Sequence, residues 1–146
     1  MDDELTVRGQ VCFALYAASR AITDVYRPVL DELGLTYPQY LVLIALGERP
    51  DEPSTVGQLG ATLQLDSGTL SPLLKRLELA GLVSRRRSER DERVVEVSLT
   101  ARGRDLRARC ATVPRQLAEA TGLPVTELVD LRDRLHQLTR AIQPRE

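Results

Sequence analysis

Cys12 and the four tyrosines are the side chains whose types and spacing could do redox chemistry. A cysteine thiolate attacks a peroxide oxygen to become a sulfenic acid, and a phenolic hydroxyl can stabilise that thiolate by a hydrogen bond. The tyrosines fall in two short segments, as Tyr16, Tyr26, Tyr37 and Tyr40. Tyr16 is one helical turn from Cys12, but Tyr26 is 14 residues away, about 21 Å along a straight helix. Tyr26 cannot reach its own Cys12, and a partner subunit could supply it.

These residues also fit simpler roles. Cys12 alone could be a small buried side chain on an amphipathic helix, and the tyrosines, Tyr40 above all, could be interface packing. The second cysteine, Cys110, is distant in sequence and forms no CxxC pair with the first. Too few histidines and cysteines are present for a zinc site, so we expect no metal and no cofactor. The single histidine, His136, is assigned no chemistry.

Arginines after the middle of the chain form a second chemical group. The net charge of -1 and the pI near 5.9 exclude a generally basic nucleic-acid coat. Residues 1–63 hold four basic and nine acidic side chains, whereas residues 64–93 hold seven basic and five acidic. A DNA surface must therefore be local. The same charges also fit a solvated surface, because Glu89, Asp91 and Glu92 partly neutralise the arginines.

Helical periodicity predicts the elements that position these groups. Apolar residues at helical spacing indicate a long first helix over residues 5–27, which Pro28 ends or bends. Thr36 can cap a short, buried second helix that includes residues 40–46. A third helix is expected over about residues 55–64.

A fourth helix carries most of the DNA-binding candidates. The Asp and Ser of residues 66–67 are good caps, and leucines repeat at helical spacing over residues 70–77. Gly81 is well placed to end this helix. Pro72 either kinks it or moves its start to Ser71.

After the fourth helix the spacing of apolar residues changes from the helical period of about 3.6 to a period of two. Residues 82–87 and 94–99 flank a charged turn and predict a hairpin. Thr100 can cap a helix that runs towards Val113, and a last amphipathic helix covers residues 125–142. Two short helices followed by a charged ribbon are typical of a winged helix-turn-helix, so the expected fold is mainly α with a small β-hairpin.

In such a fold a recognition helix enters the major groove, roughly 12 Å wide, and the ribbon reaches phosphates or the minor groove. Small polar and basic side chains suit both tasks. On the fourth helix and the hairpin the candidates are Ser67, Thr69, Ser71, Lys75, Arg76, Arg85, Arg86, Arg87, Arg90 and Arg93.

Three segments carry a resemblance to a known family. Residues 66–78, then Gly-Leu-Val at 81–83 and Asp-Glu-Arg at 91–93, resemble the core of the MarR family of transcriptional regulators, including its Asp-x-Arg wing motif. The resemblance implies that Arg93 enters the minor groove and that Asp91 helps to orient it.

The same resemblance implies a homodimer on a pseudopalindromic DNA operator. Residues 1–146 would form one domain, in which residues 36–100 are the winged helix-turn-helix core. About residues 5–35 and 101–142 would supply the N- and C-terminal dimerisation helices.

Residues 11–17 and 35–41 resemble the organic hydroperoxide-resistance regulators of that family. This resemblance implies that Cys12 is oxidised, and that Tyr26 and Tyr37 of one subunit bond the Cys12 thiolate of the other, with Tyr16 nearby. In some of these regulators a second cysteine forms a disulfide with the first. That second cysteine lies after a Val-Pro step, which is Val113-Pro114 here, and this chain has Glu119 at the matching position. Cys110 precedes that step, so a low-molecular-weight thiol could cap oxidised Cys12 instead.

The implied function is a repressor that releases its operator when an organic hydroperoxide oxidises Cys12. A MarR-type repressor released by a phenolic or aromatic ligand stays open as an alternative. A thiol peroxidase is not expected, since nothing resembles a peroxidase site with an arginine beside the cysteine. No apolar run approaches the roughly 20 residues of a membrane helix, and the acidic start lacks the basic flank of a secretory signal. We therefore expect a cytoplasmic protein.

Overall fold

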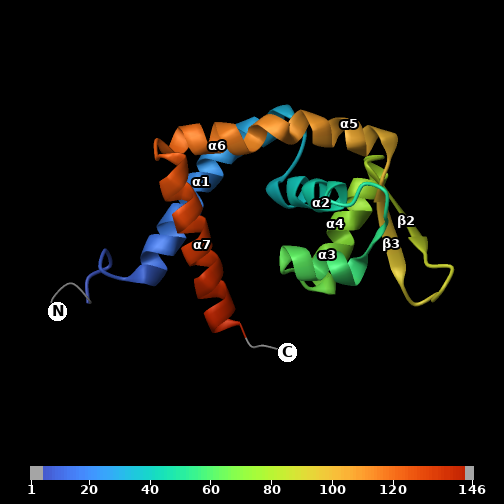
Figure 1. Ribbon diagram of the computed structural model, residues 1–146, viewed down its shortest axis with the longest axis horizontal. Helices are drawn as coiled ribbons and strands as arrows, with labels where there is room; N and C mark the ends of the chain where they lie inside the picture. The colour runs from blue at the N-terminus through green and yellow to red at the C-terminus, as the bar shows by residue number, and fades with distance from the viewer. Residues whose placement is uncertain (1–4, 144–146) are drawn as a thin grey trace. The chain divides into compact units, whose positions relative to one another are not determined.

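The computed structural model describes residues 5–143, and the chain divides into two compact units that meet after Ala111. The first unit contains five helices and a small sheet (Figure 1). Its elements are α1 (Val11–Glu32), α2 (Tyr37–Gly47), β1 (Ser54–Thr55), α3 (Val56–Leu63), α4 (Ser67–Leu79), β2 (Val83–Arg87), β3 (Val95–Leu99) and α5 (Ala101–Arg109). The predicted mainly α fold with a β-hairpin wing is confirmed.

The first helix differs from its predicted bounds at both ends. It begins at Val11 because the Thr6 hydroxyl accepts a hydrogen bond from the Gly9 N–H at 3.0 Å, which closes a turn before the helix. At the other end, Pro28 lies inside the helix rather than ending it. Proline removes one backbone bond, but Leu30 in the following turn is buried, and that packing keeps the chain helical.

Two capping boxes start the short helices as the sequence indicates. The Thr36 hydroxyl accepts from the Gln39 N–H at 3.3 Å, while the Gln39 side chain accepts from the Thr36 N–H at 3.0 Å. The same reciprocal pair at Thr55 and Gln58 starts α3. Between them, α2 is apolar on nearly all sides, and Val42 and Leu43 are fully buried. This helix is the centre of the core.

Helix α4 is capped by Asp66, whose carboxylate accepts from the Thr69 N–H at 2.7 Å. Pro72 lies within the helix, so the start does not move to Ser71. The proline stands in the second turn, where only the carbonyl four residues earlier loses its partner. Four of the five leucines of this helix, Leu70, Leu73, Leu74 and Leu77, are buried, as their spacing predicts.

The hairpin belongs to a three-stranded antiparallel sheet of order β1-β3-β2. Arg85 lies opposite Val97, and Arg86 lies opposite Glu96. The additional strand β1 pairs Ser54 with Val97. It was not predicted, because two residues between a proline-rich loop and a helix cap show no alternation.

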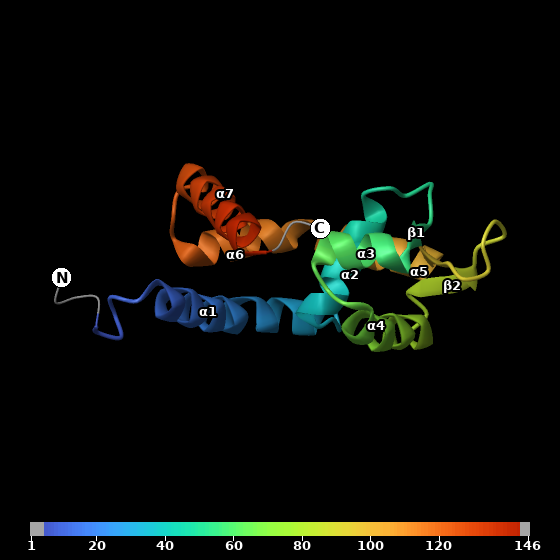
Figure 2. The same ribbon diagram turned by 90° about the horizontal axis from the view of Figure 1, so that it is seen from below.

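The second unit contains α6 (Val113–Thr121) and α7 (Val125–Ile142), seen in Figure 2. The predicted final helix is confirmed, but the helix expected to run from Thr100 towards Val113 is broken. It ends at Arg109, a 3-10 turn covers Cys110–Thr112, and α6 starts with a proline in its first turn. Proline is tolerated there because first-turn N–H groups have no helical partner.

Within residues 5–143 no single helix is long and apolar enough to cross a membrane. Helices α1 and α2 together pass that test on length and composition, but they are bent by 71° at their break.

Candidate DNA-binding surface and redox site

Helix α4 separates buried leucines from an exposed polar face. The leucines of residues 70–77 pack inward, and every α4 residue predicted to meet DNA is exposed. These residues are Ser67, Thr69, Ser71, Lys75 and Arg76. The exposed face of the helix therefore carries three hydroxyl groups and two cations. Such small polar and basic side chains suit a helix that inserts into the major groove.

The wing turn presents Arg93 in a fixed orientation. Its Nε and one terminal guanidinium nitrogen donate to the two carboxylate oxygens of Asp91 at 3.2 and 3.4 Å. The Arg93 backbone N–H adds a third bond at 3.1 Å. The Arg93 bonds hold the pKa of Asp91 below its usual value, through the side-chain bonds first and the backbone bond second. Arg93 stays about 90% exposed, so Asp91 orients the guanidinium without covering it.

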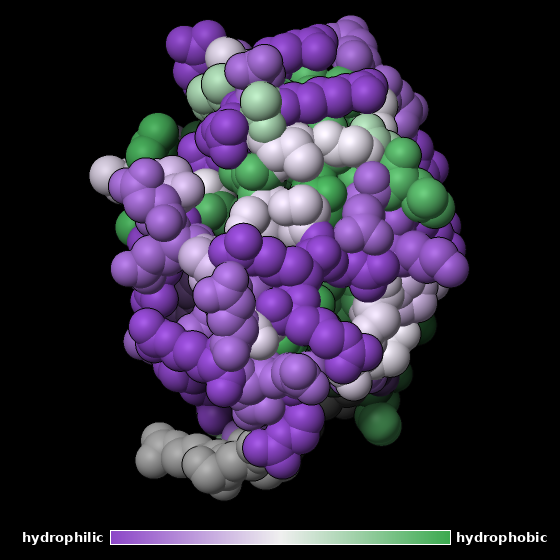
Figure 3. All heavy atoms as spheres, turned by 90° about the vertical axis from the view of Figure 1, so that its right-hand side faces the viewer, coloured by the Kyte–Doolittle hydropathy of each residue, from purple (hydrophilic) through white to green (hydrophobic). Residues whose placement is uncertain are grey.

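Three consecutive arginines on β2 have different surroundings. The Arg85 guanidinium donates to the Glu78 carboxylate of α4 at 3.1 Å and is only partly exposed. Arg86 is 73% exposed and lies 3.8 Å from Glu96, a loose ion pair. Arg87 donates to the Glu92 carbonyl at 3.1 Å near the turn. The face on the hairpin side of the molecule is mostly hydrophilic, with small apolar patches (Figure 3).

Cys12 lies in the first turn of α1 and is exposed. Tyr16, one turn later, is also exposed, and the Arg20 guanidinium carbon stands 5.6 Å from its ring centre. This arrangement is a cation–π contact along one face of the helix.

The other predicted tyrosines meet where α1 and α2 pack together. The rings of Tyr26 and Tyr37 are stacked with centres 4.4 Å apart, and Tyr40 follows at 5.8 Å from Tyr37. The Tyr26 hydroxyl is 3.1 Å from the Thr23 hydroxyl. Burial, followed by the nearby Tyr26, raises the pKa of Tyr37. Its phenol therefore stays protonated and can donate a hydrogen bond.

The chain does not bring Cys12 to this tyrosine pair. Both Cys12 and Tyr26 are on the continuous helix α1, so the helical rise separates them by about 21 Å. A pocket of about 300 Å³ opens beside the pair and is lined by Thr23, Arg27 and Thr36 among others. Each half of the predicted redox site is thus present, but not together in one chain.

Cys110 has a different environment. It is fully buried, and burial raises the pKa of its thiol, although Arg107 and Arg109 oppose that effect. Both cysteines are free. A buried neutral thiol beside Tyr40 fits a packing role.

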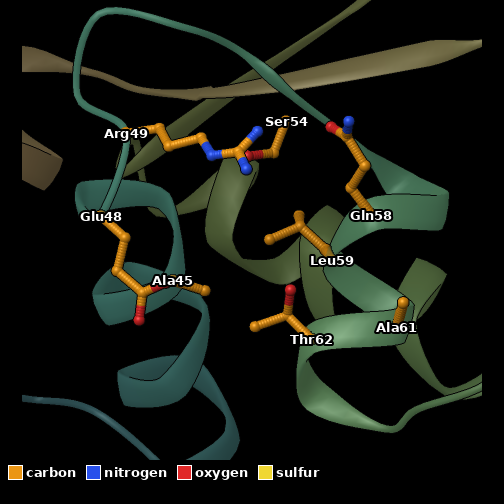
Figure 4. A pocket seen from close by; sticks show the side chains of 8 residues that line it. All are labelled: Ala45, Glu48, Arg49, Ser54, Gln58, Leu59, Ala61 and Thr62. Carbon is orange, nitrogen blue, oxygen red and sulfur yellow. The ribbon is translucent and has the colours of Figure 1, made fainter.

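Sequence reasoning missed two contacts and one pocket. Thr23 is one turn before Tyr26, a spacing that could have indicated their hydrogen bond. Glu78 meets Arg85 across a turn, where no periodic signal exists. A further pocket of about 300 Å³, between α2 and α3, holds Glu48 and Arg49 but no predicted site residue (Figure 4).

Comparison with known proteins shows the family. Residues 24–109 match the family model described as transcriptional regulator SarA/Rot. The chain is 43% identical over 140 residues to the organic hydroperoxide resistance transcriptional regulator of Bacillus subtilis, covering 96% of this chain and 94% of that protein. The chain belongs to the MarR family, in its organic hydroperoxide-resistance group.

Two solved structures place this MarR-family chain among DNA-binding proteins. Reduced AbfR bound to DNA is 34% identical, with a TM-score of 0.75, and the match covers 97% of this chain and 99% of that one. Bordetella bronchiseptica BpsR, whose DNA binding is regulated by 6-hydroxynicotinic acid, is 25% identical, with a TM-score of 0.80 over 89% and 93% of the two chains. This MarR-family chain is a DNA-binding transcriptional regulator and not an enzyme.

Proposed function

We propose that this regulator is a homodimeric repressor that releases a pseudopalindromic operator when an organic hydroperoxide oxidises Cys12. The observation that carries the proposal is the division of the redox site along α1. Exposed Cys12 stands at the start of that helix, and the stacked Tyr26 and Tyr37 lie near its other end. An antiparallel second copy would bring the Cys12 of one chain to the tyrosines of the other.

Exposed apolar side chains support dimerisation through the terminal helices. Helix α7 has no buried residue, although it is amphipathic. Its exposed apolar side chains include Val125 at 71% and Ile142 at 72%, and Val11 and Phe13 are exposed on α1. A second copy would cover these faces, with residues 5–35 and 101–142 as the predicted interface.

The proposed chemistry is a two-electron oxidation of sulfur. The Cys12 thiolate attacks the terminal oxygen of the hydroperoxide, the S–O bond forms as the O–O bond breaks, and the alkoxide leaves with a proton as an alcohol. Cys12 becomes a sulfenic acid, and the hydroperoxide is reduced. The Tyr26 and Tyr37 phenols of the partner would donate hydrogen bonds to the thiolate, with Tyr16 at the edge of the site. A low-molecular-weight thiol could then condense with the sulfenic acid, forming a mixed disulfide and water.

The proposed DNA contacts divide between α4 and the wing. Exposed α4 side chains would enter the major groove, and Arg93, oriented by Asp91, would enter the minor groove. Arg86, Arg87 and Arg90 would contact phosphates, which set affinity rather than sequence preference.

The test compares wild type with Cys12→Ser on a duplex that wild type selects from a random-sequence library, hereafter the selected duplex. Binding is measured by fluorescence anisotropy before and after cumene hydroperoxide, and again after added dithiothreitol. We expect only wild type to release the duplex, and the reductant to restore binding. Release of Cys12→Ser by the hydroperoxide, or retention of both proteins, would refute the redox function.

A specific observation favours one second candidate. The pocket beside Tyr26 and Tyr37 has room for a small aromatic acid, and BpsR responds to 6-hydroxynicotinic acid. Release of the selected duplex by such a compound, unchanged in Cys12→Ser, would support that function.

A further inference from the structure

The carboxylate of Glu78, near the end of α4, holds Arg85 of β2 through both of its oxygens. Oε1 accepts from the Arg85 guanidinium at 3.1 Å, and Oε2 accepts from the Arg85 backbone N–H at 3.2 Å. The Arg85 bonds lower the pKa of Glu78, the side-chain bond first. One side chain therefore connects the end of α4 to both the backbone and the side chain of β2.

The turn between these two residues is also fixed. Gly81 adopts φ +77°, and its N–H donates to the Glu78 carbonyl at 2.9 Å, while the Leu82 N–H donates to the Leu77 carbonyl at 3.0 Å. The Thr100 hydroxyl donates to the Gly81 carbonyl at 2.6 Å. These contacts fix where β2 starts. The Glu78–Arg85 contact is a second attachment two residues into the strand, so it constrains the direction of β2.

The location of the pair connects both proposed DNA-reading elements. A groove of about 400 Å³ is lined by Ser71 of α4, Arg85 of β2 and Arg93 of the wing. Arg85 therefore lines the same groove as a residue proposed for the major groove and one proposed for the minor groove. A carboxylate here repels DNA phosphates, so direct electrostatics gives no reason for Glu78.

We propose that Glu78 and Arg85 are positioning residues that set the angle between α4 and the wing, so that both elements meet one duplex in register. The inference rests on the proposed function, in which α4 and Arg93 read DNA. Loss of the contact leaves every proposed DNA-contacting side chain present but lets the wing move relative to α4. Binding then has to restrict that motion, which lowers affinity for the preferred sequence more than for other DNA.

The test uses Glu78→Ala, for which charge and positioning predict opposite signs. Removing a carboxylate near DNA strengthens binding if charge alone acts. We expect instead about tenfold weaker binding to the selected duplex, because binding must now restrict the motion of the wing relative to α4. Binding to a scrambled duplex of the same composition should be unchanged or stronger, and the slope of affinity against salt should be unchanged because no phosphate contact is lost.

The matched control is Glu89→Ala. Glu89 is an exposed carboxylate of the wing turn and makes no ion pair within residues 5–143. Its removal changes the charge equally, and we expect equal or stronger binding to both duplexes. Thermal unfolding of the free proteins distinguishes a loss of positioning from a folding defect. A folding defect would weaken binding to both duplexes together.

A second variant keeps the proposal falsifiable if Glu78→Ala folds poorly. Glu78→Gln retains an oxygen that can accept from Arg85, and it should keep most of the preference for the selected duplex. Stronger binding of Glu78→Ala to the selected duplex, or an equal loss on both duplexes, overturns the proposal. If Arg93→Ala and Lys75→Ala also leave binding to the selected duplex unchanged, the proposed DNA surface itself fails.

Discussion

The candidate DNA-binding surface and the proposed redox site are built in different ways. The surface comes from one stretch of chain, residues 66–93, and its orienting contacts, such as Asp91 to Arg93 and Glu78 to Arg85, lie within that stretch. The redox site joins residues from distant positions, and one chain leaves Cys12 apart from Tyr26. A single chain can therefore present the candidate DNA-reading face by itself, whereas the proposed peroxide sensing would require a second chain. In that proposal the geometry of the dimer links the two sites.

The largest effect should come from breaking the proposed dimer. Leu135→Asp with Leu138→Asp places charges on exposed apolar positions of α7, so the first unit should keep its fold. We expect a monomer by analytical ultracentrifugation, and affinity for the selected duplex reduced by about 100-fold or more through loss of avidity. Glu127→Ala with Asp130→Ala, on the same helix, is the control that should stay dimeric. A variant that stays dimeric would contradict the predicted role of residues 101–142, and a monomer that still binds tightly would contradict the need for a dimer on the operator.

A mixed dimer tests whether the redox site crosses between subunits. One chain carries Cys12→Ser with intact tyrosines, and the other carries Tyr26→Phe and Tyr37→Phe with intact Cys12. If the site is shared, the remaining Cys12 meets intact tyrosines and should react with cumene hydroperoxide at the wild-type rate, measured by stopped-flow loss of free thiol. In the homodimer of the double Tyr→Phe chain we expect reaction at least about tenfold slower, because the thiolate loses its phenolic donors.

The reverse mixed dimer is the matched control. Here the Cys12→Ser chain also carries both Tyr→Phe changes, and its partner is wild type. A shared site predicts slow oxidation of the one remaining Cys12, since it faces phenylalanines. Fast oxidation in this dimer, with slow oxidation in the first one, would place each site within a single chain.

Arg93→Ala tests the wing alone and should have an intermediate effect. We expect binding to the selected duplex to weaken by roughly 1 to 3 kcal/mol if the guanidinium reads the minor groove. Arg90→Ala is the comparison, because an exposed phosphate contact should lower affinity on selected and scrambled duplexes alike and reduce the salt slope by about 1. If Arg93→Ala lowers affinity equally for the selected and scrambled duplexes, Arg93 contacts phosphates and does not read the minor groove.

The difference between the two regions also explains what sequence could predict. Caps at Thr36 and Asp66, the leucine spacing of α4 and the wing hairpin are local patterns, and the structure confirms each. The bounds of α1 were wrong because a Thr6 turn and the packing of Leu30 outweighed apolar spacing and Pro28.

Contacts across turns were less predictable. Three consecutive arginines look alike in sequence, yet only Arg85 reaches Glu78, since strand alternation and the Gly81 turn direct it back to α4. Adjacency of Tyr26 and Tyr37 likewise depends on how two helices pack. The roles assigned to Cys12 and to the DNA-facing residues stay predictions, because they depend on a second chain and on DNA.

The smallest expected effect concerns the protonation of Asp91. Its pKa is lowered by the Arg93 bonds, so this contact is fully formed above the ordinary Asp range and is lost only as pH falls through the lowered value. DNA binding between pH 8 and 6 should therefore show no step from Asp91. In Arg93→Ala the pKa of Asp91 should rise towards its ordinary value, whereas Arg90→Ala should leave it unchanged. Carbon-13 NMR of the Asp91 carboxyl group measures both titrations. An Asp91 titration that is the same in wild type and Arg93→Ala would mean that the carboxylate does not orient the wing arginine in solution. The DNA-reading face would then be less completely prepared in the free protein than its contacts indicate.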